Sequence, residues 1–323
     1  MGVNVGATPD LELLEAARTG DGEAFRALVA PHVRALHLHC YRMLASYHDA
    51  EEAMQEVLLR AWRSLGTYEG RAPLRHWLYR IATTACLKLI AARTRRPATF
   101  TDLDYLEPYP DRLLDDLGPG TDPAAEAERR ESVSLAFVAA LQLLPASQRA
   151  ALVLHDVLGW RSDEIADLLD TSVPAVNSAL QRARASVGRA AGSRRSLDTE
   201  DRRVLARFID AWHRGDVAGL AAVLREDVVL RMPPEAMEFL GRDAVVGFFA
   251  TVPGGGRFDT IRLVATRANG QPALAAFEPA SDGVLGPYGL MVLDLEGGLV
   301  SGVNGFPAIP GRTIGAAFDL QPA

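Results

Sequence analysis

Residues 49–62 read DAEEAMQEVLLRAW, and residues 74–82 read LRHWLYRIA. In the first stretch, apolar residues recur at helical spacing and predict one buried face: Ala53, Val57, Leu58 and Trp62. Polar and acidic residues occupy the other side, at i, i+3, i+6 and i+7: Asp49, Glu52, Gln55 and Glu56. We expect Asp49 to cap this helix, with Glu52 as its capping-box partner.

Helical periodicity extends outward from this stretch over residues 10–95. The chain breaks at residues 20–22, and residues 23–44 carry an apolar stripe at helical spacing. Residues 67–73 form a short polar turn with Gly70 and Pro73, and a further helix is expected over 74–92. Residues 10–97 therefore predict one all-helical domain.

A polar segment follows at residues 98–131. It holds ten acidic side chains and four prolines, after Pro97. Such a composition is typical of a linker too polar to pack a core. Helical periodicity returns over residues 132–193, with helices expected at 149–158 and 163–169. Ser172 can cap a last helix that has Pro174 in its first turn, and the three-residue turn before it indicates a helix-turn-helix.

Charge is unevenly distributed along the chain. The formal net charge is −7, made up of +3 over residues 1–97, −7 over 98–131, +2 over 132–197 and −5 over 198–323. Residues 67–97 hold seven basic side chains against one acid, and residues 171–195 hold five arginines and no acid. Two basic helical faces in an acidic protein indicate a localised contact with a polyanion.

The last third of the chain has α+β character. Helices are expected at 199–225 and 242–250, and strands at 228–231, 261–266, 273–278, 289–295 and 299–304. Gly254–Gly256 and the Gly297-Gly298 pair are expected to form hairpins. About 120 residues suffice for an independent core.

Composition excludes several protein classes. With 48% hydrophobic and 23% charged residues, the chain is neither collagen-like nor wholly disordered. No apolar run approaches the roughly 18 residues needed to span a bilayer, and the first ten residues predict no secretory signal. Two cysteines form no disulfide framework and suit a reducing cytoplasm. His32, His37, His39 and Cys40 match no zinc signature, so we expect no metal and no cofactor.

The helical half resembles the extracytoplasmic-function (ECF) sigma factors. Residues 49–62, Tyr68–Arg71 and Leu74–Ala82 resemble their region 2. The resemblance implies that the acidic face of 49–62 (Asp49, Glu52, Gln55 and Glu56) binds the β and β′ subunits of core RNA polymerase. It implies that the turn at 67–73 receives an extruded base of the −10 element and that the following helix contacts the adjoining duplex. Aromatic residues that stack on bases alternate there with arginines, giving a predicted −10 set of Arg63, Tyr68, Arg71, Arg75, His76, Trp77, Tyr79 and Arg80.

Residues 144–149, Gly159-Trp160, 164–166 and 173–184 resemble region 4 of the same family. The resemblance implies that the last helix enters the major groove of the −35 element through Pro174, Ala175, Asn177, Ser178, Gln181, Arg182 and Arg184. Asn and Gln side chains can bond adenine in a bidentate manner, and Arg184 and Arg189 suit phosphates. Many relatives carry a basic residue around position 177 or 179, whereas this chain has Asn177 and Ala179, so the exact −35 sequence stays open.

Residues 200–310 resemble SnoaL-like domains. The resemblance rests on residues 206–216, 220–227, 232–234, 241–244 and Phe248-Phe249. It implies a bent sheet wrapped by helices into a cone with an apolar cavity. His213, Tyr288 and four acids (Asp210, Glu235, Glu238 and Glu278) are the candidates for catalysis, but they form no acid–base motif, so we expect no catalytic residue. Aromatic residues here suit a core or a cavity wall.

The sequence thus predicts a multidomain protein: two all-α sigma-factor domains and an α+β SnoaL-like cone. We expect region 2 at 10–97, an acidic linker at 98–131, region 4 at 132–193 and the SnoaL-like domain at 199–315. The predicted function is promoter recognition with core polymerase in the cytoplasm. The C-terminal domain is expected to contact the sigma regions or the linker and to regulate them, with a small apolar ligand as a possible partner and no membrane. The alternatives are an enzyme or ligand-binding protein fused to a DNA-binding regulator, and a regulator that binds DNA without polymerase.

Overall fold

A computed structural model describes residues 8–94, 106–115, 132–187, 199–233, 237–280, 283–308 and 318. The chain forms two compact units. The first contains residues 1–99, 116–118 and 140–189; the second contains 100–115, 119–139 and 190–323. The predicted boundaries near 97, 131, 193 and 315 lie outside the described residues, as do Arg189 and Glu235.

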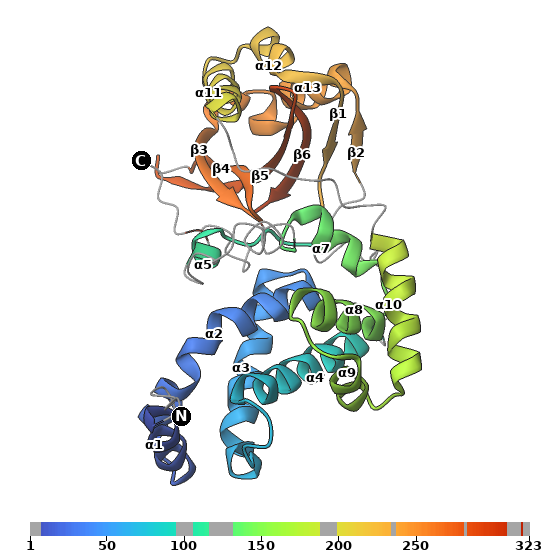
Figure 1. Ribbon diagram of the computed structural model, residues 1–323. Helices are drawn as coiled ribbons and strands as arrows, with labels where there is room; N and C mark the ends of the chain where they lie inside the picture. The colour runs from blue at the N-terminus through green and yellow to red at the C-terminus, as the bar shows by residue number, and fades with distance from the viewer. Residues whose placement is uncertain are drawn as a thin grey trace. The chain divides into compact units, whose positions relative to one another are not determined.

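The first unit begins with four helices, shown in blue to cyan in Figure 1: α1 (Thr8–Arg18), α2 (Gly22–Leu44), α3 (Tyr47–Ser64) and α4 (Leu74–Thr94). A short 3-10 turn, η1 (Leu65–Thr67), follows α3. Asp21 caps α2 by accepting from the backbone N–H groups of Glu23 and Ala24. The prediction that Asp49 caps the next helix is wrong, because the cap is Ser46, whose Oγ accepts from the Asp49 N–H at 3.1 Å.

The predicted apolar stripes form the core of this helical part. Ala53 and Val57 of α3 and Leu78 of α4 are fully buried, while Leu58 and Trp62 are half-buried. Two histidines of α2 also lie in the interior: the His39 imidazole pairs with Thr83 Oγ1 at 2.9 Å, and His37 is buried nearby in sequence. Cys40 and Cys86 are both buried free thiols.

The predicted helix-turn-helix is confirmed. It follows α7 (Leu135–Gln142) and consists of α8 (Ala146–Leu152), a π-helical stretch η2 (Val153–Val157), α9 (Ser162–Leu169) and α10 (Val173–Val187). The turn after α9 places Asp170 in the left-handed region, at φ 50°. Ser172 then caps α10, because its Oγ accepts from the Ala175 N–H at 3.4 Å.

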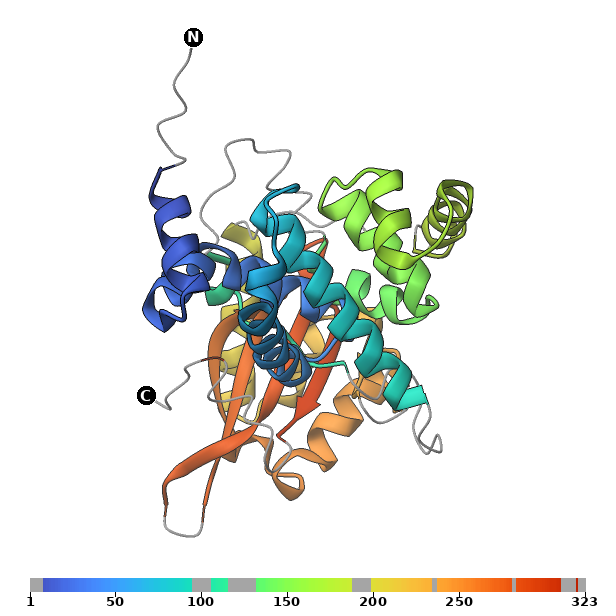
Figure 2. The same cartoon turned by 90° about the horizontal axis from the view of Figure 1, so that it is seen from below.

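The second unit is built on one six-stranded sheet in the order β2-β1-β6-β5-β4-β3. Its strands are β1 (Leu224–Arg231), β2 (Glu238–Leu240), β3 (Arg262–Ala268), β4 (Gln271–Pro279), β5 (Leu285–Glu296) and β6 (Leu299–Pro307). Only β1 and β6 pair in parallel. Figure 2 shows β4 and β5 running side by side beyond the rest of the sheet. Strand β2, which is only three residues long, was not predicted from the sequence.

Three helices lie along one face of this sheet (Figure 1): α11 (Thr199–His213), α12 (Val217–Val223) and α13 (Arg242–Thr251). They pack an aromatic cluster against the strands, in which the Trp212 ring lies 5.3 Å from that of Phe249 and 5.1 Å from that of Phe258. Gly297-Gly298 forms the expected hairpin, with positive φ at both positions. The expected hairpin at Gly254–Gly256 is wrong, because a 3-10 turn, η3 (Pro253–Gly255), leads there into η4 (Phe258–Thr260).

Part of the acidic linker belongs to the core of the second unit. Residues 106–115, which include helix α5 (Arg112–Asp115), carry four buried apolar side chains: Leu106, Tyr109, Leu113 and Leu114. The prediction that this segment is too polar to pack is therefore wrong for its described part. The overall composition of the linker, with its ten acidic residues, gave no indication that these four apolar side chains would be buried.

Candidate nucleic-acid interface

Helix α10 presents an open polar face. Every residue predicted to read the −35 element is exposed: Pro174, Ala175, Asn177, Ser178, Gln181, Arg182 and Arg184. The opposite face is anchored by Val176, Leu180 and Ala183, which are buried in the helix-turn-helix core. This alternation places a row of hydrogen-bonding side chains outward, as entry into a major groove requires.

Two of these side chains are already oriented by neighbours. Ser162 Oγ donates to Asn177 Oδ1 at 2.9 Å, which leaves the Asn177 amide N–H groups available. The Arg184 guanidinium pairs with Asp156, and Nε donates to Oδ2 at 2.9 Å. Burial opposes ionisation of Asp156, but hydrogen bonds from Arg184 and His155 outweigh it and lower the pKa of that carboxyl. Arg184 is thus held as a cation in a fixed position.

The acidic face of α3 is narrower than predicted. Glu52 and Gln55 are exposed, and the half-buried Glu56 pairs with Arg60 one turn later. Asp49 is only 6% exposed and is ion-paired with Arg93 of α4. The expectation that Asp49 shares an exposed acidic face is therefore wrong; its carboxylate instead joins two helices.

The predicted −10 residues gather at the start of α4 and in the turn before it. Arg63, Arg71, Arg75 and Arg80 are exposed, whereas Tyr79 is buried. The Tyr68 hydroxyl donates to the Ala72 carbonyl at 2.7 Å, and the Tyr68 and Trp77 rings lie 5.3 Å apart. A hollow of about 310 Å³ opens between these rings and the side chains of Arg71 and Arg80. Its walls combine stacking surfaces with two arginines, as an unpaired base requires, and also carry three acidic residues: Glu69, Glu164 and Asp167.

Trp160 and two residues of helix α9, Glu164 and Asp167, line one side of this hollow. The His76 ring stacks on Trp160 with centroids 4.7 Å apart and planes at 20°. Arg80 Nη2 donates to the Asp167 carbonyl at 3.0 Å, and His76 Nδ1 lies 3.6 Å from Glu164 Oε1. The helix-turn-helix therefore occupies two predicted −10 residues, which no local sequence pattern indicated.

A buried arginine, Arg149, also joins the helix-turn-helix to the N-terminal helices. Arg149 of α8 is 6% exposed and donates to three backbone carbonyls, those of Met43, Gln142 and Leu144. Gln142 in turn donates to the Arg42 carbonyl at 3.4 Å. Region 4 is thus bound to the C-terminal end of α2 by hydrogen bonds to a charged group, which are among the stronger ones.

Within the second unit, the β3–β4 turn holds one residue within the linker, Tyr109, and one just after it, Val133. Asn269 lies in the left-handed region at φ 57°. Its backbone N–H donates to the Tyr109 carbonyl at 2.9 Å, and its Oδ1 accepts from the Tyr109 N–H at 2.7 Å. Its Nδ2 donates to the Val133 carbonyl at 2.7 Å. One asparagine therefore joins a linker residue to a residue that follows the linker, 24 positions apart in sequence.

Neighbouring residues extend this contact, which we call the linker clasp (Arg267–Gln271 with Tyr109–Asp111 and Val133–Leu135). Asp111 Oδ1 accepts from the Gly270 N–H at 2.7 Å, and its Oδ2 lies 3.1 Å from Arg267 Nε. Gln271 Oε1 accepts from the Leu135 N–H at 3.1 Å. All the polar groups involved are thus paired rather than buried alone, which favours a specific association.

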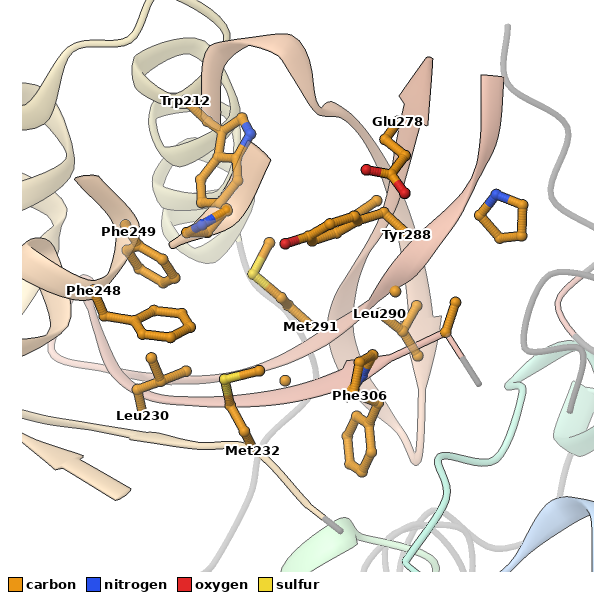
Figure 3. Close-up of a pocket in the computed structure, with 17 residues that line it drawn as sticks. Trp212, Leu230, Met232, Phe248, Phe249, Glu278, Tyr288, Leu290, Met291 and Phe306 are labelled. Carbon is orange, nitrogen blue, oxygen red and sulfur yellow. The ribbon is translucent and has the colours of Figure 1, made fainter. Parts of the chain in front are cut away.

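The candidate catalytic residues of the second unit do not converge. Asp210 pairs with Arg214 on the surface and Glu238 with Arg231, and His213 Nε2 accepts from the Leu263 N–H at 3.0 Å. Only Glu278 and Tyr288 border the same apolar cavity, shown in Figure 3. Within the described ranges, no group of three or more His, Cys, Asp or Glu side chains could hold a metal ion.

Comparisons with known proteins agree with these three parts. Sequence models for sigma-70 region 2, sigma-70 region 4 and the SnoaL-like domain match residues 28–96, 134–187 and 205–290. The chain is 41% identical over 315 residues to the ECF RNA polymerase sigma factor SigG of Mycobacterium tuberculosis, spanning 90% of this chain and 82% of SigG. It is 34% identical over 183 residues to SigM of that organism, spanning 57% of this chain and 85% of SigM. The crystal structure of M. tuberculosis SigJ covers 94% of this chain and aligns over its whole length, with a TM-score of 0.60 and 24% identity, a likeness of fold.

Proposed function

Because this chain belongs to the ECF family of RNA polymerase sigma factors, we propose that its two helical regions read a promoter while its C-terminal domain controls the linker between them. Family membership assigns it core polymerase and promoter DNA as partners and a non-catalytic role. Among the described residues, no helix is both long and apolar enough to cross a membrane. We propose that it acts in the cytoplasm, beside its polymerase.

The −35 element would be bound by the exposed face of α10. Asn177 and Gln181 would bond base edges, and Arg182 and Arg184 would bond phosphates. The exposure of all seven predicted residues supports this assignment. The −10 element would use the hollow beside Tyr68 and Trp77, with an extruded base packed against one of these rings and nearby arginines facing the phosphates: Arg63, Arg71, Arg75 and Arg80.

Core polymerase would be bound by Glu52, Gln55 and Glu56. Their carboxylates and amide lie on one side of α3, where complementary basic groups would guide docking. Asp49 would contribute indirectly, because its ion pair with Arg93 fixes α3 against α4.

The linker clasp is the observation that carries the regulatory part of this proposal. By holding Tyr109 and Val133 on one turn, the SnoaL-like domain limits how regions 2 and 4 can separate. Separation matters because Trp160 and Asp167 of region 4 contact His76 and Arg80 of region 2. A domain on the same chain acts at high effective concentration, so a modest contact suffices.

Run-off transcription with core polymerase tests this function in the full chain. Asn269→Gly keeps the left-handed backbone but removes the two side-chain hydrogen bonds that Asn269 makes to Tyr109 and Val133. We expect promoter-specific transcripts from the wild type and a severalfold change in their yield from Asn269→Gly. The exposed Glu226→Gln serves as the matched control. Equal yields from all three proteins would contradict clasp regulation, and no promoter-specific transcript at all would contradict sigma activity.

Catalysis by the C-terminal domain is the alternative. It would need an acid and a base that converge on substrate, and the described residues offer only Glu278 and Tyr288 at one cavity. We propose that this domain binds and regulates rather than catalyses.

A further inference from the structure

The SnoaL-like domain encloses an apolar cavity of about 300 Å³. Trp212, Phe248 and Phe249 form the wall on the helix side, and Met232 and Met291 form the wall on the sheet side (Figure 3). A dry cavity of about 150 Å³ accommodates benzene, so twice that volume suits a body of two fused rings. Aromatic faces and thioethers both pack well against flat apolar rings.

Polar groups at this cavity are few and lie toward one end. The Trp212 indole N–H already donates to the Ile261 carbonyl at 3.1 Å, so it is committed to the fold. The Tyr288 hydroxyl points into the space between Trp212 and Met291, and the Glu278 carboxylate lies above the Tyr288 ring (Figure 3). Burial, and then the nearby charge of Glu278, raise the pKa of Tyr288, so its hydroxyl stays neutral and keeps its proton.

Among the residues that the structure describes, Glu278 is the only charged side chain on the cavity lining. It is exposed at the end of β4 and, within the described part of the chain, forms no ion pair. Three other carboxylates of this domain are paired instead: Asp227 with Arg225, Asp259 with Arg257 and Glu238 with Arg231. An unpaired carboxylate beside an aromatic ring forms a site with negative potential on two sides.

We propose that this cavity binds an amphiphilic organic cation: an apolar body of about two rings seated between Phe248, Phe249 and Met291, with an amine directed at Glu278. The face of Tyr288 would add a cation–π contact, and its hydroxyl would accept a hydrogen bond from the ammonium. The binding site is separate from the linker clasp, and the proposal does not depend on clasp regulation.

Three naphthalene probes of equal size test the charge preference. Isothermal titration of the full chain at pH 7 would compare 1-(aminomethyl)naphthalene, 1-naphthylmethanol and 1-naphthoate. We expect the amine to bind about fivefold more tightly than the alcohol, since an exposed ion pair contributes little more than that, and at least tenfold more tightly than the carboxylate. Equal affinity of all three, or no binding of the amine at millimolar concentration, would overturn the proposal.

Variants then locate the bound probe. Glu278→Gln should abolish the preference for the amine over the alcohol while leaving the alcohol's affinity unchanged, and Glu226→Gln should alter neither. At Gly305 an added Cβ would sit 3.5 Å from Met232 Cγ and 3.8 Å from the Arg231 carbonyl oxygen, both ordinary contacts, so Gly305→Ala narrows the cavity without a clash to the backbone. It should weaken all three probes at least tenfold with an unchanged melting temperature. An amine preference that survives Glu278→Gln would show that another group provides it and would refute the assignment.

Discussion

The two surfaces proposed to read DNA differ in how accessible they are. The seven predicted residues of α10 all face solvent, whereas the −10 hollow shares its walls with Trp160, Glu164 and Asp167 of region 4. The same helix-turn-helix therefore presents one DNA surface and covers part of the other. We infer that −35 binding needs no rearrangement within this unit, whereas release of Trp160 and Asp167 would open the −10 hollow further.

The largest expected effect is a loss of stability at low pH, which should affect region 2 and its proposed −10 surface before α10. Burial lowers the pKa of His37 to about 4 and that of His39 to about 3, both in region 2. The unfolded chain therefore binds more protons below pH 6.5; stability is complete above that pH and falls by about 1.4 kcal/mol per pH unit for each histidine toward pH 4. From pH 6.5 to 5 we expect the two histidines together to cost about 3 kcal/mol, measured by urea unfolding.

Hydrogen exchange at pH 5 would show whether that loss is local. Amides of α2 and α4 should lose protection before those of α10, which carries no buried histidine. A variant with His37→Gln and His39→Gln should lose most of the acid sensitivity. Uniform loss of protection across α2, α4 and α10 would contradict a region 2 origin.

Removing Arg149 should have the next largest effect. Arg149→Met removes the bond that joins α8 to the Met43 carbonyl of α2, and a hydrogen bond to a charged group contributes about 1.5–3 kcal/mol. We expect unit 1 to lose about 2 kcal/mol of unfolding free energy in urea titrations. The exposed Arg182→Met should change it by less than about 0.5 kcal/mol. Similar values for both variants would mean that Arg149 does not hold region 4 against α2.

The open surface is tested by Gln181→Ala. A bidentate base contact contributes about 1–3 kcal/mol of discrimination, so promoter-specific transcription should fall about tenfold. The exposed Ser186→Ala, one turn later on α10, should leave it unchanged. Transcription that is insensitive to Gln181→Ala would remove this side chain from the −35 contact.

The smallest effect is expected from a substitution at the −10 hollow, which region 4 partly covers. Trp160→Phe reduces the stacking on His76, an interaction of about 0.5–1.5 kcal/mol, and should release the −10 hollow in part. We expect a two- to fivefold gain in affinity for a single-stranded −10 oligonucleotide, measured by fluorescence anisotropy. Trp62→Phe makes the same chemical change away from this contact and should have no effect. A loss of affinity in Trp160→Phe would indicate that Trp160 itself contacts DNA.

Local pattern was enough to predict the elements but not their associations. Helical spacing predicted α2, α3, α4 and α10, and alternation predicted five of the six strands, because each buries one regular face. The stacking of His76 on Trp160 and the bond from Arg149 to Met43 join residues 84 and 106 positions apart, and neither carries a local signal. The prediction that Asp49 lies on an exposed acidic face was wrong for a related reason, because its ion-pair partner, Arg93, lies on another helix.

The linker clasp also changes how far the two DNA-reading regions can part. Between Thr94 and Leu135 the chain has roughly 40 residues, an extended reach of about 140 Å, or roughly 40 base pairs of duplex. With Tyr109 and Val133 tied to one turn, only about 15 of those residues contribute, and the reach falls to about 50 Å, or roughly 15 base pairs. We therefore propose that the closed clasp limits the longest spacer between promoter elements that a single chain of this protein can bridge.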